Sequence, residues 1–316
     1  MRVYRSLSDV PPAPAGRALA LGTFDGVHLG HRMVIASAVE RAREGGLVST
    51  VVTFDPHPVC VLRPDEPPRL LTTTGQKIDL ISGLGVDEVV TVPFTTELSR
   101  QSAEDFSDEV LVGALGARSV SVGRNFRFGH GAAGDAELLA SRPEFETTVV
   151  ELVQHGDQSI SSSRIRNLLA EGEVASAAEL LAAPYSVVGP VVEGDRRGHD
   201  LGVPTANVEP PTEVVVPAPG IYAGIAAADG ISPTPAAISI GVRPTFDDSG
   251  ELRVEAHLIG FDGDLYGRQV KLTFLERLRD EVRFDSAEEL VEQMKRDVEQ
   301  AKAVTYRAGF AGNSVK

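Results

Sequence analysis

GTFDGVHLGH, residues 22–31, joins a predicted strand to a predicted helix and sets the fold of the N-terminal half. The run that leads into it, ALALGTF (18–24), is apolar. Residues 31–44 repeat with helical periodicity until Gly45-Gly46, where a glycine C-cap is expected. The next segment, LVSTVVTF (47–54), is rich in β-branched residues and predicts a buried strand. This order of strand, helix and strand predicts a parallel sheet.

The same decapeptide carries the strongest chemical signal in the chain. Gly22 and Gly26 allow a tight turn that exposes backbone N–H groups, and Gly30 allows close approach between His28 and His31. Two imidazoles beside the positive end of a helix suit a phosphate group. Histidines at this spacing are also found in metal sites, but no third ligand of suitable spacing is evident.

Strands and helices continue to alternate as far as Pro184. Beyond residue 54 the pattern predicts strands at 89–94, 119–123 and 147–153, and helices at 74–84, from Ser102, at 135–142 and at 163–183. Ser102 and Asp105 have the spacing of a capping box. The alternation predicts an α/β domain over residues 1–184, with a parallel sheet covered by helices on both faces.

The pattern changes in residues 185–316. Short strands separated by Gly, Pro and Asp replace the alternation, and five of the 20 prolines lie between 204 and 219, where they favour a loop or sheet edge. Five or six such strands with no helix between them predict a small antiparallel β-barrel. Ser286 and Glu289 then cap a long amphipathic helix that closes the chain.

Composition excludes several classes of protein. The chain has 316 residues and a formal net charge of −15, with both halves acidic and no run of Lys or Arg, which argues against duplex nucleic acid or an anionic membrane as partner. It has one cysteine, Cys60, so a disulfide framework is excluded and a structural thiol is expected. No signal core or stretch of 18 apolar residues occurs. We expect a soluble, cytoplasmic, two-domain protein, and a homo-oligomer is compatible with the sequence.

Several motifs together carry a resemblance to a known family. GTFDGVHLGH resembles the HxGH signature of Rossmann-like nucleotidylyltransferases, and ISSSRIR (160–166) resembles their second element, with Ser163 in place of the usual Thr. With TFDPHP (53–58), VGRNFRFGHGAAG (122–134) and PTAN (204–207), the chain resembles the bacterial bifunctional riboflavin kinase/FAD synthetase family along nearly its whole length. The resemblance implies an N-terminal FMN adenylyltransferase domain and a C-terminal riboflavin kinase barrel.

The resemblance also implies roles for residues of the N-terminal half. His28 and His31 would contact phosphates during transfer of the adenylyl group from ATP to FMN. Further contacts to ATP and its phosphates fall on Gly22, Thr23, Phe24, Ser162, Ser163 and Arg164. The FMN site falls on Asn125 and His57, with an apolar shelf for the flavin ring formed by Phe54, Pro56, Pro58 and Phe128. Core packing is the ordinary alternative for these shelf residues.

In the C-terminal half the resemblance assigns Glu255 as the general base that takes the proton of the ribityl 5′-hydroxyl of riboflavin. Thr205 and Asn207 would ligate Mg²⁺, a hard ion that prefers oxygen. The glycine-rich turn with Gly194 and Gly198 would bring backbone N–H groups to ATP phosphates. His199 stands where the family commonly has Arg or Lys, and this departure leaves the strength of the kinase open.

Two other functions compete with this prediction. The barrel could bind flavin as a sensor without catalysing phosphorylation, leaving only an FMN adenylyltransferase. The segment Gly129-His130-Gly131-Ala132-Ala133-Gly134 spells GxGxxG, the outline of a dinucleotide-binding fingerprint in a nicotinamide oxidoreductase. Five residues separate the predicted strand from the first of these glycines and Pro143 ends the following helix, so the fingerprint is rejected.

Overall fold

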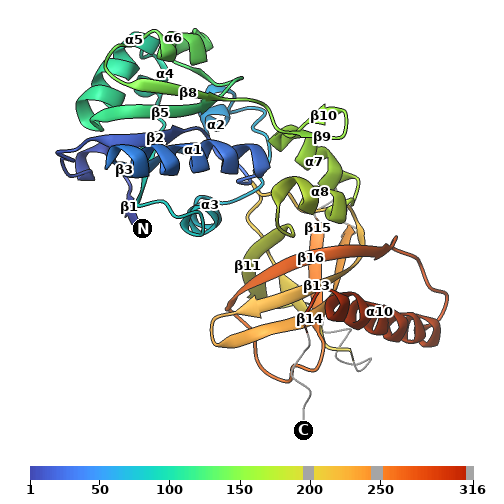
Figure 1. Cartoon of the computed structure of the whole chain (residues 1–316). Helices are drawn as coiled ribbons and strands as arrows, with labels where there is room; N and C mark the ends of the chain where they lie inside the picture. Colours follow the sequence, from blue (N-terminus) through green and yellow to red (C-terminus); the bar gives the residue numbers. More distant parts are fainter. Residues whose placement is uncertain (195–202, 243–251, 311–316) are drawn as a thin grey trace. The chain divides into compact units, whose positions relative to one another are not determined.

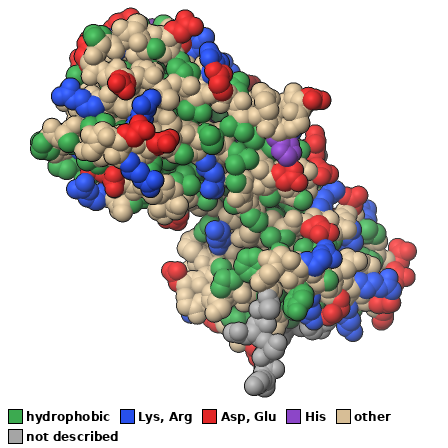
Figure 2. Space-filling view, viewed as in Figure 1, with side chains coloured by type: hydrophobic (Ala, Val, Ile, Leu, Met, Phe, Trp, Pro, Cys, Tyr) green, Lys and Arg blue, Asp and Glu red, His purple; other side chains and the backbone are tan. Residues whose placement is uncertain are grey.

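The computed structural model describes residues 1–194, 203–242 and 252–310 (Figure 1). Its contacts divide the chain into two compact units, Met1–Ser162 and Ser163–Lys316, and each is described by itself. No helix among the described residues is both long enough and apolar enough to cross a membrane. Figure 2 shows acidic and basic side chains interspersed over the visible face of both units.

The first unit is built on a six-stranded parallel sheet, as the alternating sequence pattern predicts. Its strand order is β1-β4-β3-β2-β5-β8, and every neighbouring pair is parallel. The strands are β1 (Arg2–Tyr4), β2 (Arg17–Leu21), β3 (Val48–Asp55), β4 (Glu88–Pro93), β5 (Ala117–Gly123) and β8 (Glu146–Val150). Strand β1 is the one member that the sequence pattern did not predict.

Helices and short segments connect these strands. The helices are α1 (Leu29–Gly45), α2 (Pro58–Leu62), α3 (Thr74–Ser82), α4 (Thr96–Ser99), α5 (Ala103–Asp105) and α6 (Ala136–Ala140), with 3₁₀ turns η1 (Leu7–Asp9) and η3 (His130–Ala132) and a π-helical segment η2 (Phe106–Ala114). Two small hairpins are β6 (Arg127–Phe128) with β7 (Gly134–Asp135) and β9 (Gln154–His155) with β10 (Gln158–Ser159).

The two faces of the sheet bury separate cores, as period-2 alternation along each strand requires. In β3, Val52 and Phe54 point to the core shared with η2 and α6, whereas Val51 points to the core shared with α1 and α3. The predicted caps are formed: Gly46 ends α1 with φ of 62°, and Ser102 accepts a hydrogen bond from the Asp105 N–H at the start of α5. Helices therefore cover both faces of the sheet, as predicted.

A buried ion pair lies at the amino ends of the strands. Glu88 is 1% exposed and accepts a 2.9 Å hydrogen bond from Arg17 Nε, and its other oxygen pairs with Arg2 at 2.7 Å. The Arg17 guanidinium also donates to the carbonyls of Leu115 and Pro11. This network joins β2, β4 and the edge strand β1 with the segment that precedes β5.

Replacing Glu88 with alanine should lower the free energy of unfolding of the first unit by about 3–5 kcal/mol, because the Arg17 charge stays buried without its partner. Chemical denaturation followed by circular dichroism measures the change. Glu44→Ala, which breaks an exposed pair with Arg41 on α1, is the matched control and should cost less than about 1 kcal/mol. Equal effects of the two substitutions would contradict this account of the network.

The second unit is the predicted antiparallel barrel with its closing helix. Six strands form a closed barrel in the order β11-β12-β15-β14-β13-β16, all pairs antiparallel. They are β11 (Ser186–Val192), β12 (Ala206–Val208), β13 (Gly220–Ala228), β14 (Ile231–Val242), β15 (Leu252–Leu258) and β16 (Gln269–Arg279). Helix α10 (Ala287–Arg307) begins at the Ser286 cap and lies along β13 and β14 in Figure 1.

Two further helices belong by their contacts to the second unit. They are α7 (Ser162–Ala170), whose first residue still falls in the first unit, and α8 (Val174–Leu181). The Ala218 N–H donates to the Leu169 carbonyl at 2.9 Å, and a Cβ at Gly172 would meet the Arg277 side chain of β16. The division by contacts therefore falls ahead of these helices, and the functional boundary after residue 184 stays a prediction.

Candidate functional site

The turn at residues 22–31 places two histidine rings in direct contact. His28 is the N-cap of α1, and its Nδ1 accepts a 3.3 Å hydrogen bond from the His31 N–H. The two rings stack with centroids 3.6 Å apart and an interplanar angle of 15°, and Phe24 packs edge-on against His31. The predicted pair is thus assembled at the carboxyl end of β2, where ligands bind in parallel α/β sheets.

The backbone of this turn is held in an uncommon conformation. Phe24 and Val27 have positive φ angles of 50° and 44°, which side-chain-bearing residues seldom adopt. The Asp25 carboxylate accepts hydrogen bonds from the N–H groups of Leu71 at 2.9 Å and Thr72 at 3.2 Å, and Ser162 Oγ donates to the Asp25 carbonyl at 2.9 Å. The turn is therefore fixed by contacts, and Ser162 of the second predicted motif lies against it.

Both histidines are neutral near pH 7. Burial lowers the pKa of His28 to about 4. Burial, followed by the charges of His28 and Lys77, lowers the pKa of His31 well below its ordinary value. His31 Nδ1 is buried without a hydrogen-bond partner among the described residues. A neutral pair offers directed hydrogen bonds to a ligand but supplies no net positive charge.

The lowered pKa of His28 predicts a pH dependence of stability. Between pH 6.5 and about 4 the unfolded chain binds a proton at His28 and the folded chain does not, so the free energy of unfolding falls as the pH falls through this window. Across this window the His28 ring lowers the free energy of unfolding by about 3 kcal/mol in total. Denaturation of wild type and His28→Asn at several pH values measures it: the variant should lack this part of the slope. Parallel curves would contradict the assignment.

The two aromatic members of the predicted flavin shelf are part of the hydrophobic core in this structure. Phe54 and Phe128 are each 8% exposed and both contact Phe106, with ring centroids 6.4 and 5.9 Å from it. Phe126 stacks on Phe128 at 5.6 Å. The structure thus brings the two predicted aromatics into one cluster and adds Phe106 and Phe126, which sequence reasoning missed. Their part in flavin binding stays a prediction.

The remaining predicted flavin contacts lie on two loops. Asn125 is exposed in the turn between β5 and β6, and His57 caps α2 by accepting a 3.2 Å hydrogen bond from the Val59 N–H. Pro56 and Pro58 flank His57. The glycines of GxGxxG lie in the β6–β7 hairpin. Gly129 and Gly134 serve packing, since a Cβ at either would collide with Ala103, whereas Gly131 has open space and a positive φ of 63°.

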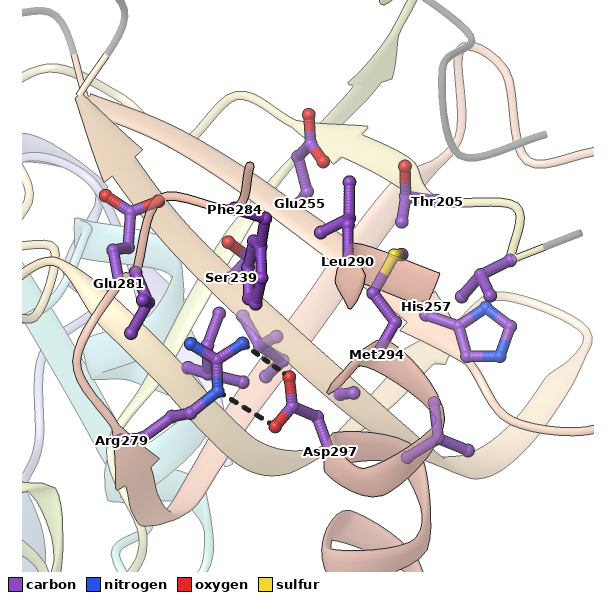
Figure 3. Close-up of a pocket in the computed structure, with 16 residues that line it drawn as sticks. Thr205, Ser239, Glu255, His257, Arg279, Glu281, Phe284, Leu290, Met294 and Asp297 are labelled. Atoms are coloured by element: carbon purple, nitrogen blue, oxygen red, sulfur yellow. Dashed lines mark hydrogen bonds and ion pairs between the residues drawn. The ribbon is translucent and has the colours of Figure 1, made fainter. Parts of the chain in front are cut away.

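In the barrel unit, Glu255 and Thr205 line one cavity of about 260 Å³ (Figure 3). One wall comes from strands β13, β14 and β15, and the other comes from α10 and the segment before it. Its apolar lining includes Ile221, Phe284, Leu290, Met294 and Val298. An ion pair closes one side, with Arg279 donating to both Asp297 oxygens at 2.9 and 2.6 Å. Sequence reasoning found Glu255 and Thr205 but missed the wall that α10 provides.

Asn207 lies beside Glu255, because the two residues are register partners in β12 and β15. Arg253 joins them: its Nε donates to Asn207 Oδ1 at 2.8 Å and pairs with Glu255 at 2.6 Å. A Cβ at Gly194 would overlap the Asn207 amide, so this position needs glycine for close approach. Gly198 and His199 lie outside the described residues.

These oxygens fit a magnesium ion by their chemistry. The amide oxygen of Asn207 and the carboxylate of Glu255 are hard donors on the neighbouring strands β12 and β15, and the hydroxyl of Thr205 immediately precedes β12. No group of three His, Cys, Asp or Glu side chains suited to a metal occurs in the part of the chain that the structure describes. A site here would therefore use oxygen ligands together with the phosphates of its substrate.

A parallel α/β unit with a two-histidine turn, followed by a barrel with a carboxylate in an apolar cavity, defines a two-domain, nucleotide-dependent transferase. Residues 10–164 match the family model for FAD synthetase, and residues 181–305 match that for riboflavin kinase. The chain belongs to the bifunctional riboflavin kinase/FMN adenylyltransferase family, whose members produce FMN and FAD.

Individual relatives cover nearly the whole chain. The bifunctional riboflavin kinase/FMN adenylyltransferase of Pseudomonas fluorescens is 36% identical over 96% of this chain and 98% of that protein. The protein of the same description from Escherichia coli K12 is 36% identical over 94% and 96%. A solved chain described as a macrolide-efflux protein from Streptococcus pneumoniae has a TM-score of 0.86 at 30% identity and covers 95% of this chain and 97% of its own. That likeness supports the two-unit fold along the chain.

Proposed function

We propose that the barrel cavity binds riboflavin with its ribityl 5′-hydroxyl toward Glu255, and that the two-histidine turn binds the phosphates during transfer of the adenylyl group to FMN. The observation that carries the first assignment is the position of Glu255 in the wall of an apolar cavity of about 260 Å³. A flavin ring needs such an apolar wall, and its ribityl chain needs polar groups at one end.

Phosphorylation follows from the placement of Glu255. Its carboxylate takes the proton of the 5′-hydroxyl, the hydroxyl oxygen attacks the γ-phosphorus of ATP, and the bond from this phosphorus to the oxygen of ADP breaks. Arg253 orients the carboxylate through the 2.6 Å contact. Mg²⁺ held by Thr205 and Asn207 would screen the phosphate charge, and Gly194 and Gly198 would bring backbone N–H groups near the phosphates.

Adenylyl transfer needs no covalent enzyme intermediate. A phosphate oxygen of FMN attacks the α-phosphorus of ATP, the bond from this phosphorus to the bridging oxygen breaks, and pyrophosphate leaves. His28 and His31 donate hydrogen bonds to phosphate oxygens on which charge accumulates, from a turn already fixed by Asp25. The backbone at Gly22, Thr23 and Phe24, together with Ser162, Ser163 and Arg164, completes the contacts to ATP.

For this reaction FMN binds beside the turn. Asn125 and His57 contact FMN, and the ring rests on Phe54, Phe128 and the prolines around His57. Because Phe54 and Phe128 are 8% exposed, FMN binding requires a rearrangement of the β6–β7 hairpin or of α2.

The released products, ADP and pyrophosphate, distinguish the two reactions experimentally. With riboflavin and ATP, the full chain should release ADP first and pyrophosphate later, because FMN must form before it is adenylylated. With FMN and ATP it should release pyrophosphate alone. Pyrophosphate without prior ADP in the riboflavin reaction, or riboflavin binding without ADP formation, would contradict the proposal, and the second result would identify a flavin-sensing barrel.

A further inference from the structure

Lys77 is a buried charged side chain that the reactions described above do not use. It lies on α3 and is 4% exposed. It is also the only lysine before residue 271, so all the remaining Lys or Arg positions of the first unit are arginine. Burying an ammonium group is costly unless it gains partners, so its position calls for a function.

The contacts of Lys77 connect it to the two-histidine turn. Its Nζ donates to Thr53 Oγ1 at 3.3 Å, and Thr53 Oγ1 donates to the Thr23 carbonyl at 3.0 Å. Asp25, in the middle of the turn, accepts hydrogen bonds from the segment just before α3. Helix α3 itself begins with a complete capping box between Thr73 and Gln76. The ammonium is therefore held in place before any ligand binds.

The bonding capacity of this ammonium is largely unused. An ammonium group has three N–H donors, and in the described part of the chain Thr53 is its one hydrogen-bond acceptor. Burial lowers the pKa of Lys77, while the charges of Asp25 and Asp55 raise it and favour the ammonium form. Neither carboxylate forms an ion pair with Nζ among the described residues. Lys77 is thus buried beside acidic groups without being neutralised by direct contact.

Like Lys77, His31 has hydrogen-bonding capacity that the described residues do not use. Its Nδ1 is buried without a partner among the described residues, and the charge of Lys77 is one of the causes, after burial and His28, that lower the pKa of His31. Lys77 reaches the turn through Thr53 and the Thr23 carbonyl, and both Lys77 and His31 have hydrogen-bonding positions that the described residues leave open. A ligand with several acceptor oxygens and negative charge would satisfy both.

We propose that Lys77 is a further phosphate-binding residue of the adenylyl-transfer site, which donates its free N–H groups to the phosphate oxygens beside His31. The proposal rests on the proposed function of the two-histidine turn. It explains how a site with neutral histidines and a net acidic chain provides positive charge where phosphates bind. A compact ammonium on a fixed helix supplies that charge without the fork geometry of arginine.

The first test is Lys77→Met, which keeps the length of the side chain and removes the charge. In the full chain it should lower kcat/KM for FAD formation from FMN about 100-fold and weaken binding of inorganic pyrophosphate, measured by calorimetry, at least 30-fold. Riboflavin phosphorylation by the same preparation should stay within twofold, which reports that the chain is folded. Asp79→Asn, an exposed charge change on the same helix, is the matched control and should leave both activities unchanged.

A purely structural role would give a different pattern. In that case Lys77→Met would lower the melting temperature while pyrophosphate binding at low temperature stayed within twofold of wild type, and the proposal would be wrong. Thr53→Ser, which keeps the hydroxyl that accepts from Lys77, should bind pyrophosphate nearly as well as wild type. Binding lost equally in both variants would also overturn the proposal.

A third test uses the wild-type chain and therefore does not depend on whether a variant folds. In a chain with isotope-labelled lysine, the ammonium resonance of Lys77 should shift on saturation with pyrophosphate, and an unchanged resonance would overturn the proposal. Failure here is distinct from failure of the proposed function. If His28→Ala abolishes FAD formation while Lys77→Met does not reduce it, only the assignment of Lys77 is wrong, whereas full activity of both variants would refute the site itself.

Discussion

Replacing Glu255 with glutamine should lower the rate of riboflavin phosphorylation about a thousandfold, because the amide cannot take the proton of the attacking hydroxyl. Glutamine keeps the shape of the side chain and one oxygen for Arg253, so the cavity and riboflavin binding should be retained. FAD formation from added FMN should be unchanged, since that reaction belongs to the other unit. Initial rates of ADP release with riboflavin measure the effect.

The control for this prediction is Glu276→Gln. Glu276 lies on β16 of the same unit, is exposed and pairs with Arg307, but it does not line the cavity. Its rate of phosphorylation should stay within twofold of wild type. If Glu255→Gln keeps more than a third of the wild-type rate, Glu255 is not the general base.

The second large effect is expected at His28. His28→Ala should lower kcat for FAD formation by about 100- to 1000-fold, as loss of a preorganised donor to a transition state does, while riboflavin phosphorylation continues. Part of the change could arise from the lost N-cap of α1, which is worth about 1 kcal/mol of stability. His28→Asn separates the two roles, because asparagine caps helices well but lacks the imidazole.

His28→Asn should therefore restore stability but not FAD formation. His130→Asn, at an exposed histidine of η3 in the same unit, is the control and should keep full activity. Rates of pyrophosphate release with FMN and ATP distinguish these outcomes. If His28→Ala forms FAD at the wild-type rate, the mechanism at the two-histidine turn is refuted.

Most of the fold could be predicted because its signals are local. Gly46, Ser102 and Ser286 end or begin helices through contacts a few residues away, and the alternating burial of β15 follows its alternating sequence. Strand β1 was missed because three residues carry too little periodicity, and its place is set by pairing with β4 far along the chain.

The arrangement of candidate site residues could be predicted where it depends on their spacing in the sequence. It could not be predicted where it depends on packing between distant segments. His28 and His31 stack because they are three residues apart at a helix start. Lys77 could not be found, because a lysine in a helical pattern is ordinarily exposed, and its burial depends on contacts with Thr53 and the distant turn. Likewise, the contact of Arg253 with Asn207 depends on the register of β12 against β15.

The charge of −15 takes on a clearer meaning from these sites. The chain is acidic and ATP and FMN are anions, so long-range electrostatic attraction does not bring these substrates to the protein. Under the proposed function, binding would instead depend on local features: helix N-termini, glycine-exposed amides, Arg164, Lys77 and Mg²⁺. The net charge mainly favours solubility.

The most direct test of two separate sites on one chain is a time course of flavin products from riboflavin, ATP and Mg²⁺, resolved by chromatography. In the wild type, FMN should rise first and FAD should follow at its expense, whereas Glu255→Gln should form neither and His28→Ala should accumulate FMN alone. Accumulation of FAD by His28→Ala, or a wild-type chain that converts added FMN but never riboflavin, would contradict it.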